Sequence, residues 1–276
     1  MRKPMIKIYA VLAVSLVLCL LCTPSVLGHT SAWSSGVAIR LKLLINKNAS
    51  AASAVEDTAR IVFIMDDGWE TQYTQGYAIL EKYDYPGCVA VIPAAVNTNG
   101  YMNYSELADL YIDGWDMLNH TNNHELLTDL SGDEQKEQLV KAREWLQSHG
   151  LRRGSDIVVF PGGGFDQATL QALKDEGFSA GRSLKSLWTV NTGCSLEDAE
   201  VCNLLPGLNM DYVTAAVDKA IHNHSTLLFV IHKLEPVSDD QHMQLPPEEF
   251  TRIVEYVHDH DSELSVVTLS QLLDYL

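Results

Sequence analysis

Residues 60–69 read RIVFIMDDGW, a short apolar run that ends abruptly in two aspartates and a glycine. A run of β-branched and aromatic side chains closed by turn residues is typical of a buried β-strand. A helix-period segment follows at about residues 72–84. The same rhythm repeats along the chain, with further apolar runs at 88–93, 115–119, 156–160, 178–181, 227–231 and 264–269.

Helical patterns separate these runs, at about 104–112, 132–149, 166–176, 210–223, 247–260 and 268–275. The chain also carries boundary signals for such helices, with starts at Asp133, Asp166 and Pro246-Pro247 and stops at Gly150 and Gly177. Strands that alternate with helices imply a parallel sheet, and about seven such units imply a closed or nearly closed barrel. We therefore predict an α/β fold, a (β/α) barrel of about seven strands in a single domain over residues 59–276. A doubly wound open sheet is the alternative.

The N-terminus has the order of regions found in secretory signal peptides. Basic residues within positions 1–7 are followed by an apolar run from Ile8 to Cys22, and small residues come shortly before Gly28. The run is shorter than the roughly 20 residues that span a bilayer. We expect residues 1–28 to be a signal peptide and residues 29–58 to be a flexible leader. The protein would then be secreted or held at the cell surface, in contact with a membrane only if the N-terminal segment is retained.

The charge balance argues against one class of partner. The chain has 36 acidic and 19 basic side chains, which gives a formal net charge of −17. A surface this acidic repels polyphosphates, so we expect no nucleic acid partner.

Three cysteines lie beyond the N-terminal apolar run. Cys88 sits in the apolar run GCVAVIP and is expected to be a buried free thiol. Cys194 and Cys202 could close a short disulfide loop in an oxidising compartment.

The unusual polar residues fall directly after the apolar runs. They are Asp66-Asp67-Gly68-Trp69 after the first run, His120-Thr121-Asn122-Asn123-His124 after the third, Pro161-Gly162-Gly163-Gly164 after the fourth, Arg182-Ser183 after the fifth and His232 after the sixth. In a parallel barrel the carboxyl ends of all strands meet at one face, where such enzymes place their active sites. We predict that these side chains converge there.

Two histidines and an aspartate among them suggest a metal site. His120 and His124 are four positions apart, so on one helical turn both imidazoles would face the same cation. Two histidines and one carboxylate leave coordination positions open for water or substrate, as a catalytic metal requires. Asp66 and Asp67 point in opposite directions along an extended backbone, so one could bind metal while the other acts differently. The plainer alternatives are surface or core histidines and an acidic turn at Gly68.

Taken in order, these motifs resemble the polysaccharide deacetylases of the NodB-homology kind, carbohydrate esterase family 4. The matching pieces span residues 60 to about 270 and are MDDGW at 65–69, HTNNH at 120–124, FPGGG at 160–164 and IHK around His232. The resemblance implies a distorted (β/α) barrel in which Asp67, His120 and His124 bind one divalent metal ion, commonly Zn²⁺. The implied partner is an acetylated carbohydrate polymer.

The resemblance also implies roles for the other residues. Asp66 would be the general base and His232 the general acid. The metal, together with a backbone N–H near Pro161, Gly162 and Gly163, would stabilise the oxyanion of the tetrahedral intermediate.

The chain departs from the family pattern at two points. Many members carry an arginine two residues before the proline of the third motif, where this chain has Val159. We predict that Arg182 takes over that place beside the catalytic base from another strand. There is also no clear equivalent of the acid–tryptophan motif that orients the catalytic histidine in some relatives.

The substrate is the least defined part of this interpretation. Four aromatic residues could stack on sugar rings or pack in the core, namely Trp69, Tyr73, Trp115 and Trp188. The expected activity is removal of N-acetyl groups from a cell-wall or extracellular glycan by a secreted, metal-dependent hydrolase. The alternatives are an O-acetyl esterase acting on an acetylated polysaccharide and a catalytically silent carbohydrate-binding barrel.

Overall fold

The structure is a computed structural model that describes residues 58–191, 193–196, 199–236 and 243–274. The predicted signal peptide at 1–28 and nearly all of the predicted leader at 29–58 lie outside these ranges. Within the described ranges, no helix combines the length and the apolar character needed to span a bilayer.

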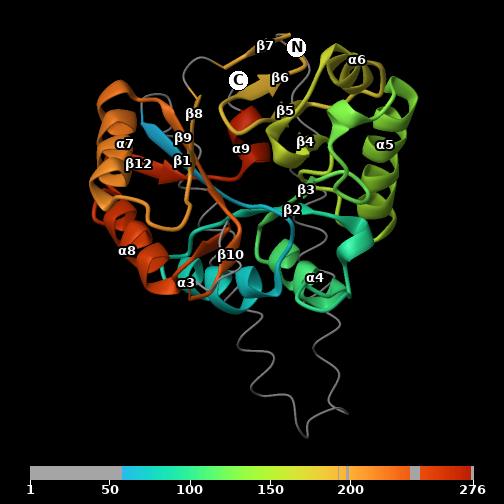
Figure 1. Ribbon diagram of the computed structural model, residues 1–276. Helices are drawn as coiled ribbons and strands as arrows, with labels where there is room; N and C mark the ends of the chain where they lie inside the picture. Colours follow the sequence, from blue (N-terminus) through green and yellow to red (C-terminus); the bar gives the residue numbers. More distant parts are fainter. Residues whose placement is uncertain (1–57, 192, 197–198, 237–242, 275–276) are drawn as a thin grey trace, which may run out of the picture. The chain divides into compact units, whose positions relative to one another are not determined.

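A ten-stranded sheet forms the frame of the domain (Figure 1). Its strands follow the order β7-β6-β5-β4-β3-β2-β1-β9-β8, and β12 also pairs with β1. Their bounds are Ala59–Met65 (β1), Cys88–Val91 (β2), Asp116–Asn119 (β3), Ile157–Val159 (β4), Ala180–Arg182 (β5), Leu187–Thr189 (β6), Cys194–Ser195 (β7), Ala199–Asn203 (β8), Thr226–Ile231 (β9) and Leu264–Val266 (β12). A separate pair consists of β10 (Lys233–Leu234) and β11 (Gln244–Leu245).

Most neighbouring strands are parallel, and only β6 runs antiparallel to its neighbours β5 and β7. The sheet curls into a nearly closed barrel, and no pairing between β7 and β8 occurs among the described residues. The predicted distorted (β/α) barrel is therefore confirmed. The sequence did not reveal β6, β7, β8, β10 and β11, because these short strands lack a continuous apolar run.

Each predicted helical segment forms a helix in the structure. They are the π-helix η2 (Gln72–Tyr77) with α3 (Ala78–Glu81), then α4 (Tyr104–Ile112), α5 (Gly132–Ser148), α6 (Gln167–Asp175), α7 (Met210–Asn223), α8 (Pro247–His258) and α9 (Leu269–Asp274). The described residues also include the 3₁₀ turns η3 (Pro93–Ala95), η4 (Leu127–Asp129) and η5 (Pro161–Gly163). The N-terminal cap of α5 lies two residues before the expected Asp133, because Ser131 and Glu134 form a capping box.

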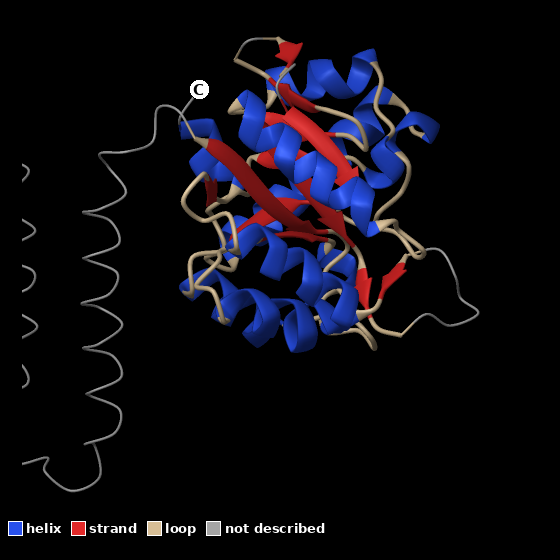
Figure 2. Ribbon diagram, turned by 90° about the vertical axis from the view of Figure 1, so that its left-hand side faces the viewer, coloured by secondary structure: helices blue, strands red, loops and turns tan. Residues whose placement is uncertain are grey.

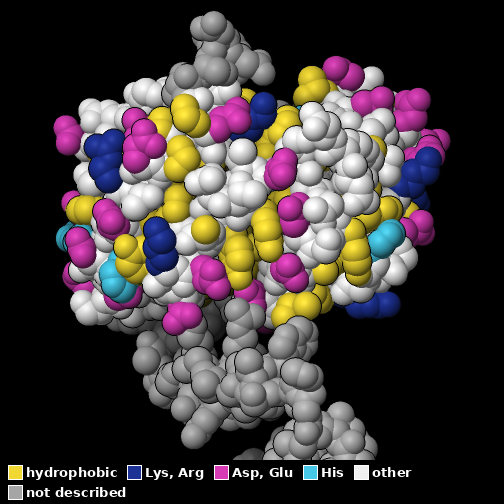
Figure 3. All heavy atoms as spheres, turned by 90° about the horizontal axis from the view of Figure 1, so that it is seen from below, with side chains coloured by type: hydrophobic (Ala, Val, Ile, Leu, Met, Phe, Trp, Pro, Cys, Tyr) yellow, Lys and Arg dark blue, Asp and Glu magenta, His cyan; other side chains and the backbone are white. Residues whose placement is uncertain are grey.

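The buried hydrophobic residues of the described chain form three clusters, and successive side chains of β1 alternate between two of them. Ile61 and Phe63 belong to a cluster with residues of α3, α4, α7 and α8, whereas Val62 and Ile64 belong to a cluster on the other face of the sheet. Helix α9 contributes to this second cluster. Figure 2 shows the strands lying between layers of helices. In the space-filling view of one face, acidic side chains are scattered among apolar ones and do not form a single patch (Figure 3).

Candidate metal centre and active site

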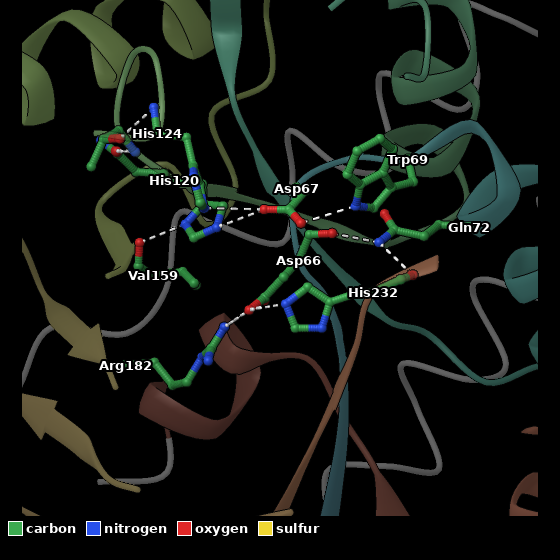
Figure 4. A network of polar contacts seen from close by, with 11 residues as sticks. Asp66, Asp67, Trp69, Gln72, His120, His124, Val159, Arg182 and His232 are labelled. Atoms are coloured by element: carbon green, nitrogen blue, oxygen red, sulfur yellow. Dashed lines mark hydrogen bonds and ion pairs between the residues drawn. The ribbon is translucent and has the colours of Figure 1, made fainter. Parts of the chain in front are cut away.

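The carboxyl ends of four strands bring the predicted polar residues together (Figure 4). Asp66 and Asp67 follow β1, His120 follows β3, Arg182 ends β5 and His232 follows β9. The hydrogen-bond ladder between β1 and β9 continues one residue past β1, because the Asp66 N–H donates to the carbonyl of Ile231 at 2.8 Å. The convergence expected at this end of the barrel is present.

Asp67, His120 and His124 form a tight cluster. One carboxylate oxygen of Asp67, Oδ1, lies 3.2 Å from Nε2 of His120 and 3.3 Å from Nε2 of His124. Potential ligand atoms of the three residues lie within 4.8 Å of one another, and no other such group of three occurs in the part of the chain that the structure describes. The three side chains are therefore close enough to share one ion.

The hydrogen bonds around the cluster fit a divalent cation. Asp67 Oδ1 is buried and has no hydrogen-bond partner, which is costly unless a further group binds there. The other ring nitrogen of His120, Nδ1, lies 2.7 Å from the carbonyl of Val159. Because a carbonyl only accepts, Nδ1 donates and the lone pair of Nε2 faces Asp67, the orientation of a metal-binding histidine. Imidazole and carboxylate are ligands that Zn²⁺ favours.

A strained loop, not a helix, presents the second histidine. Residues 120–124 form no helical turn, so the helical geometry that we expected for the pair is wrong. Thr121 and His124 have φ values of +60° and +66°, and Asp67 has +77°. Left-handed backbone at three non-glycine residues of one site is kept only where surrounding contacts enforce it. One such contact is the 3.1 Å hydrogen bond from the His124 N–H to Thr121 Oγ1.

Asp66 points away from the cluster toward an arginine and a histidine. Nη2 of Arg182 lies 2.5 Å from both carboxylate oxygens of Asp66, and Arg182 is fully buried. Nε2 of His232 lies 3.8 Å from Asp66 Oδ2. Arg182 of β5 thus contacts Asp66, as predicted for a residue that replaces the family's arginine, which is absent at Val159.

Gln72 links the two strand ends that carry Asp66 and His232. It is fully buried, and its Nε2 donates to the carbonyl of Asp66 at 2.5 Å and to that of His232 at 2.9 Å. Sequence reasoning gives Gln72 no such role, because no local pattern indicates that a helical glutamine joins two strands. It lies in the π-helix η2, a local geometry that is frequent at functional sites.

Burial shapes the protonation of the site. Burial alone would raise the pKa of Asp67, but the nearby imidazole of His120, with those of His232 and His124, holds it well below its usual range. Burial, reinforced by the neighbouring His120, lowers the pKa of His124. Burial likewise lowers the pKa of His232, against the opposing charges of Asp66 and Asp67. These shifts favour a neutral imidazole at His124 and a charged carboxylate at Asp67, the states in which these two residues can bind a metal ion.

Some nitrogen atoms of His232 and Arg182, the residues around Asp66, have no hydrogen-bond partner within the described residues. Nδ1 of His232 and two guanidinium nitrogens of Arg182, Nε and Nη1, are buried without a hydrogen bond. The orienting acid that the sequence does not reveal is therefore also absent from the described ranges.

The glycine loop lies beside two exposed leucines. Gly162 and Gly163 have φ values of +59° and +72°. A Cβ on Gly163 would lie 2.6 Å from the side chain of Leu184 and 2.8 Å from its backbone nitrogen, so this position requires glycine, whereas one on Gly162 would meet only the end of the exposed Leu126 side chain. The N–H of Gly163 is already bound to the carbonyl of Phe160.

The four aromatic candidates have different surroundings. Trp69 stacks on Tyr101 beside the cluster, with ring centroids 4.2 Å apart. Tyr73 donates to Asp109 on α4 and is stacked on Tyr77. Trp115 is 1% exposed and belongs to the core, so it does not offer a face to sugar. Trp188 lies in β6, half-buried.

The cysteines contribute no covalent link in the described part of the chain. Cys88 is a buried free thiol, as expected. Cys202 is also free and buried, which contradicts the disulfide that we considered between it and Cys194. The side chain of Cys194 lies outside the described residues.

Comparisons with known proteins agree with the motifs. Residues 54–181 match the sequence model of the polysaccharide deacetylase family. A curated relative, the putative polysaccharide deacetylase YxkH of Bacillus subtilis, is 21% identical over 121 residues, which are 44% of this chain and 43% of the relative. The chain thus aligns with less than half the length of this relative.

Solved structures share the fold. A putative polysaccharide deacetylase from Mycobacterium smegmatis superposes with a TM-score of 0.60 at 14% identity, over 81% of this chain and 92% of that one. A family 4 acetyl xylan esterase from Clostridium thermocellum, in complex with a cobalt ion, gives a TM-score of 0.54 at 15% identity, over 78% and 91%.

Proposed function

We propose that this chain, whose residues 54–181 match the polysaccharide deacetylase family, is a secreted, metal-dependent hydrolase that removes N-acetyl groups from a cell-wall or extracellular glycan. The observation that supports this most is the Oδ1 atom of Asp67, buried without a hydrogen bond and facing two imidazole nitrogens. Asp67, His120 and His124 would hold the ion, for which Zn²⁺ is our proposal. When bound, such an ion polarises a carbonyl and lowers the pKa of water.

Asp66 is suited to take a proton from the attacking water. Its carboxylate is held by Arg182, and its backbone is held by Gln72, so it is oriented without help from the substrate. Its carboxylate points toward Arg182 and His232, yet its charge still acts on the ring of His124, a ligand of the proposed ion. These contacts support the role of general base.

Two further groups would complete the reaction. The oxygen of water bonds to the acetyl carbon, and the N–H of Gly162 is the candidate donor to the resulting oxyanion, because Pro161 has no N–H and that of Gly163 is already bound. His232 would then deliver a proton to the departing nitrogen as the C–N bond breaks. The products are acetate and a free amino sugar.

An O-acetyl esterase is the second candidate, and one observation favours it. Nδ1 of His232 has no partner among the described residues, so no acid there stabilises the protonated ring. An amine must be protonated before it leaves, whereas an alcohol leaving group depends less on a strong acid. A weakly supported His232 therefore suits esters better than amides.

An acetate-release screen tests the proposal. The purified chain, supplied with Zn²⁺, is incubated with N-acetylated and O-acetylated glycans, and the acetate that is released is measured. Release by the wild type and its loss in Asp67→Ala are expected. A protein that binds metal but releases no acetate from any glycan would instead be a silent carbohydrate-binding barrel.

Secretion is a separate part of the proposal, and the order of regions in residues 1–28 supports it. Mass spectrometry of the protein recovered from the culture medium should find a chain that begins close to residue 29. Full-length protein kept inside the cell would contradict this part and leave the hydrolase proposal untouched.

A further inference from the structure

We propose that Trp69 is a positioning residue for the metal ligand Asp67 and not a platform for sugar. The proposal deepens the function above and rests on the metal site inferred there. It assigns Trp69 an effect on metal affinity, which can be measured without any substrate.

The indole N–H selects which carboxylate oxygen stays free. Nε1 of Trp69 donates to Oδ2 of Asp67 at 2.9 Å. The other oxygen, Oδ1, is thereby left as the one that faces His120 and His124. A carboxylate whose second oxygen is already bound cannot rotate freely, so the geometry of the three ligands is set before an ion arrives.

The backbone around Trp69 is held by a second segment of the chain. The N–H of Glu70 donates to the carbonyl of Gly100, and the N–H of Met102 donates to the carbonyl of Gly68, each at 2.9 Å. These bonds flank an antiparallel bridge between Trp69 and Tyr101. The indole is thus anchored by backbone pairing in addition to side-chain packing.

Neighbours also occupy the faces of the indole. The phenol ring of Tyr101 is stacked on it at 4.2 Å, with 23° between the planes. The ammonium group of Lys233 lies 4.4 Å from the ring centre. A stacked phenol leaves no room for an ammonium on the same face, so the two neighbours cover opposite faces. Neither face is open to a sugar ring, which argues against the stacking role considered for Trp69.

The size of the effect follows from other metal sites. Partners that orient a ligand typically change metal affinity by about 10- to 100-fold when they are removed. The bond from Trp69 to a charged oxygen belongs to the stronger class of hydrogen bonds. Removing only the N–H should therefore weaken metal binding measurably and leave the fold intact.

Trp69→Phe removes the N–H and keeps an aromatic ring beside Tyr101 and Lys233. Competition with a coloured chelator should give a Co²⁺ affinity about 10- to 100-fold weaker than that of the wild type. The matched control, Tyr101→Leu, removes the stacked ring but keeps the N–H, and its affinity should stay within about threefold. Thermal unfolding of both variants without metal, followed by circular dichroism, checks that each is folded.

The outcomes separate the two proposals. Wild-type protein that binds no Co²⁺ would overturn the proposed function. A wild type that binds one ion, with equal affinity in Trp69→Phe, would overturn the positioning role alone. If Trp69→Phe also raises KM for an acetylated glycan while the Co²⁺ affinity is unchanged, Trp69 is a sugar platform and the positioning role is wrong.

A measurement on the wild type covers the case in which the variant does not fold. The chain has five tryptophans, so ¹⁵N-tryptophan labelling gives a small set of indole N–H signals. Adding Zn²⁺ should shift one of these signals more than the others. The same signal should also lie at a different position in metal-free Asp67→Ala than in the metal-free wild type. If no indole signal responds to either change, the proposal is wrong.

Discussion

Two buried aspartates bound to arginines lie at opposite ends of the barrel strands. Asp66 and Arg182 meet at the carboxyl ends, beside the candidate metal centre. Asp116 begins β3 at the amino ends and pairs with Arg153, whose Nε lies 3.3 Å from Asp116 Oδ1. Both carboxylates are almost inaccessible to solvent, so burial alone does not tell a catalytic pair from a structural one.

The surroundings of the two pairs differ. Asp116 accepts hydrogen bonds from the N–H and the hydroxyl of Ser270, at 2.7 and 2.8 Å, and so ties β3 to the start of α9. Arg153 is partly exposed and donates to the carbonyl of Tyr111. Arg182, by contrast, is fully buried, and its guanidinium group has only Asp66 as a hydrogen-bond partner among the described residues.

This difference indicates what each pair is for. The Asp116 carboxylate is bound from three directions by groups that do not change during a reaction, as expected for a structural tie. Among the described residues, Arg182 leaves two guanidinium nitrogens without a hydrogen bond, Nε and Nη1, whereas Arg153 leaves only Nε. The Asp66–Arg182 pair also lies at the end of the barrel where active sites lie, where unpartnered polar atoms are costly for stability and useful for chemistry. We therefore expect substitutions at Asp66 and Arg182 to affect rate and those at Asp116 to affect stability.

The largest expected effect is that of Asp66→Asn on rate. The amide keeps the shape of the side chain but cannot take a proton, so acetate release should fall by about 10³-fold. The Co²⁺ affinity should stay close to that of the wild type, because Asp66 is not a ligand. Asp116→Asn is the matched control and should keep its rate within about twofold. An equal loss of acetate release in Asp66→Asn and Asp116→Asn would show that the two pairs do not differ in role.

Asp116→Ala should affect stability instead. The N–H and the hydroxyl of Ser270 lose their acceptor, which typically costs about 1–3 kcal/mol, and α9 loses its bonds to β3. The partly exposed Arg153 adds little to this cost. Urea unfolding followed by circular dichroism measures this change in the free energy of unfolding. The rate per folded molecule, assayed at low temperature, should be that of the wild type. An unchanged unfolding midpoint would mean that this pair does not hold α9.

Arg182→Ala should lower the rate of acetate release by about 10²-fold, the size expected when a reacting group is misplaced. Asp66 would keep its carboxylate but lose the group that orients it. Arg153→Ala, the corresponding change beside Asp116, should leave the rate unchanged. Full activity in Arg182→Ala would rule out the idea that Arg182 supports the base.

The smallest effect concerns pH. Burial raises the pKa of Asp116 above its ordinary value of 3.8, outweighing the opposing bonds from Ser270 and the charge of Arg153. Between 3.8 and its raised pKa, Asp116 keeps a proton in the folded state that the unfolded chain has released. The free energy of unfolding therefore falls as pH rises through this window, by at most about 1.4 kcal/mol per pH unit.

Asp116→Asn cannot ionise and isolates this contribution. Urea titrations at several pH values give the difference in the free energy of unfolding between wild type and variant. We expect the wild type to lose stability relative to Asp116→Asn as pH rises above 3.8. A change in the opposite direction would show that the bonds to Ser270 and Arg153 outweigh burial.

The sequence predicted the barrel, and it predicted which side chains converge at the carboxyl ends of the strands, because both depend on local patterns. Apolar runs such as residues 60–65 mark the strands, and the polar residues that follow them converge once the strands are parallel. The loop of His124 was missed, because its left-handed backbone depends on contacts that no spacing rule contains. The bonds from Asp116 to Ser270 and from Trp69 to Asp67 depend on side-chain orientations that appear only after folding.

The central claim is that Asp67, His120 and His124 close around one ion. A crystal grown with Co²⁺, with anomalous data collected at the cobalt edge, tests it most directly. We expect one strong peak about 2.0–2.3 Å from Asp67 Oδ1 and from the Nε2 atoms of His120 and His124. A peak elsewhere, or no peak in crystals whose wild-type protein is otherwise intact, would contradict it.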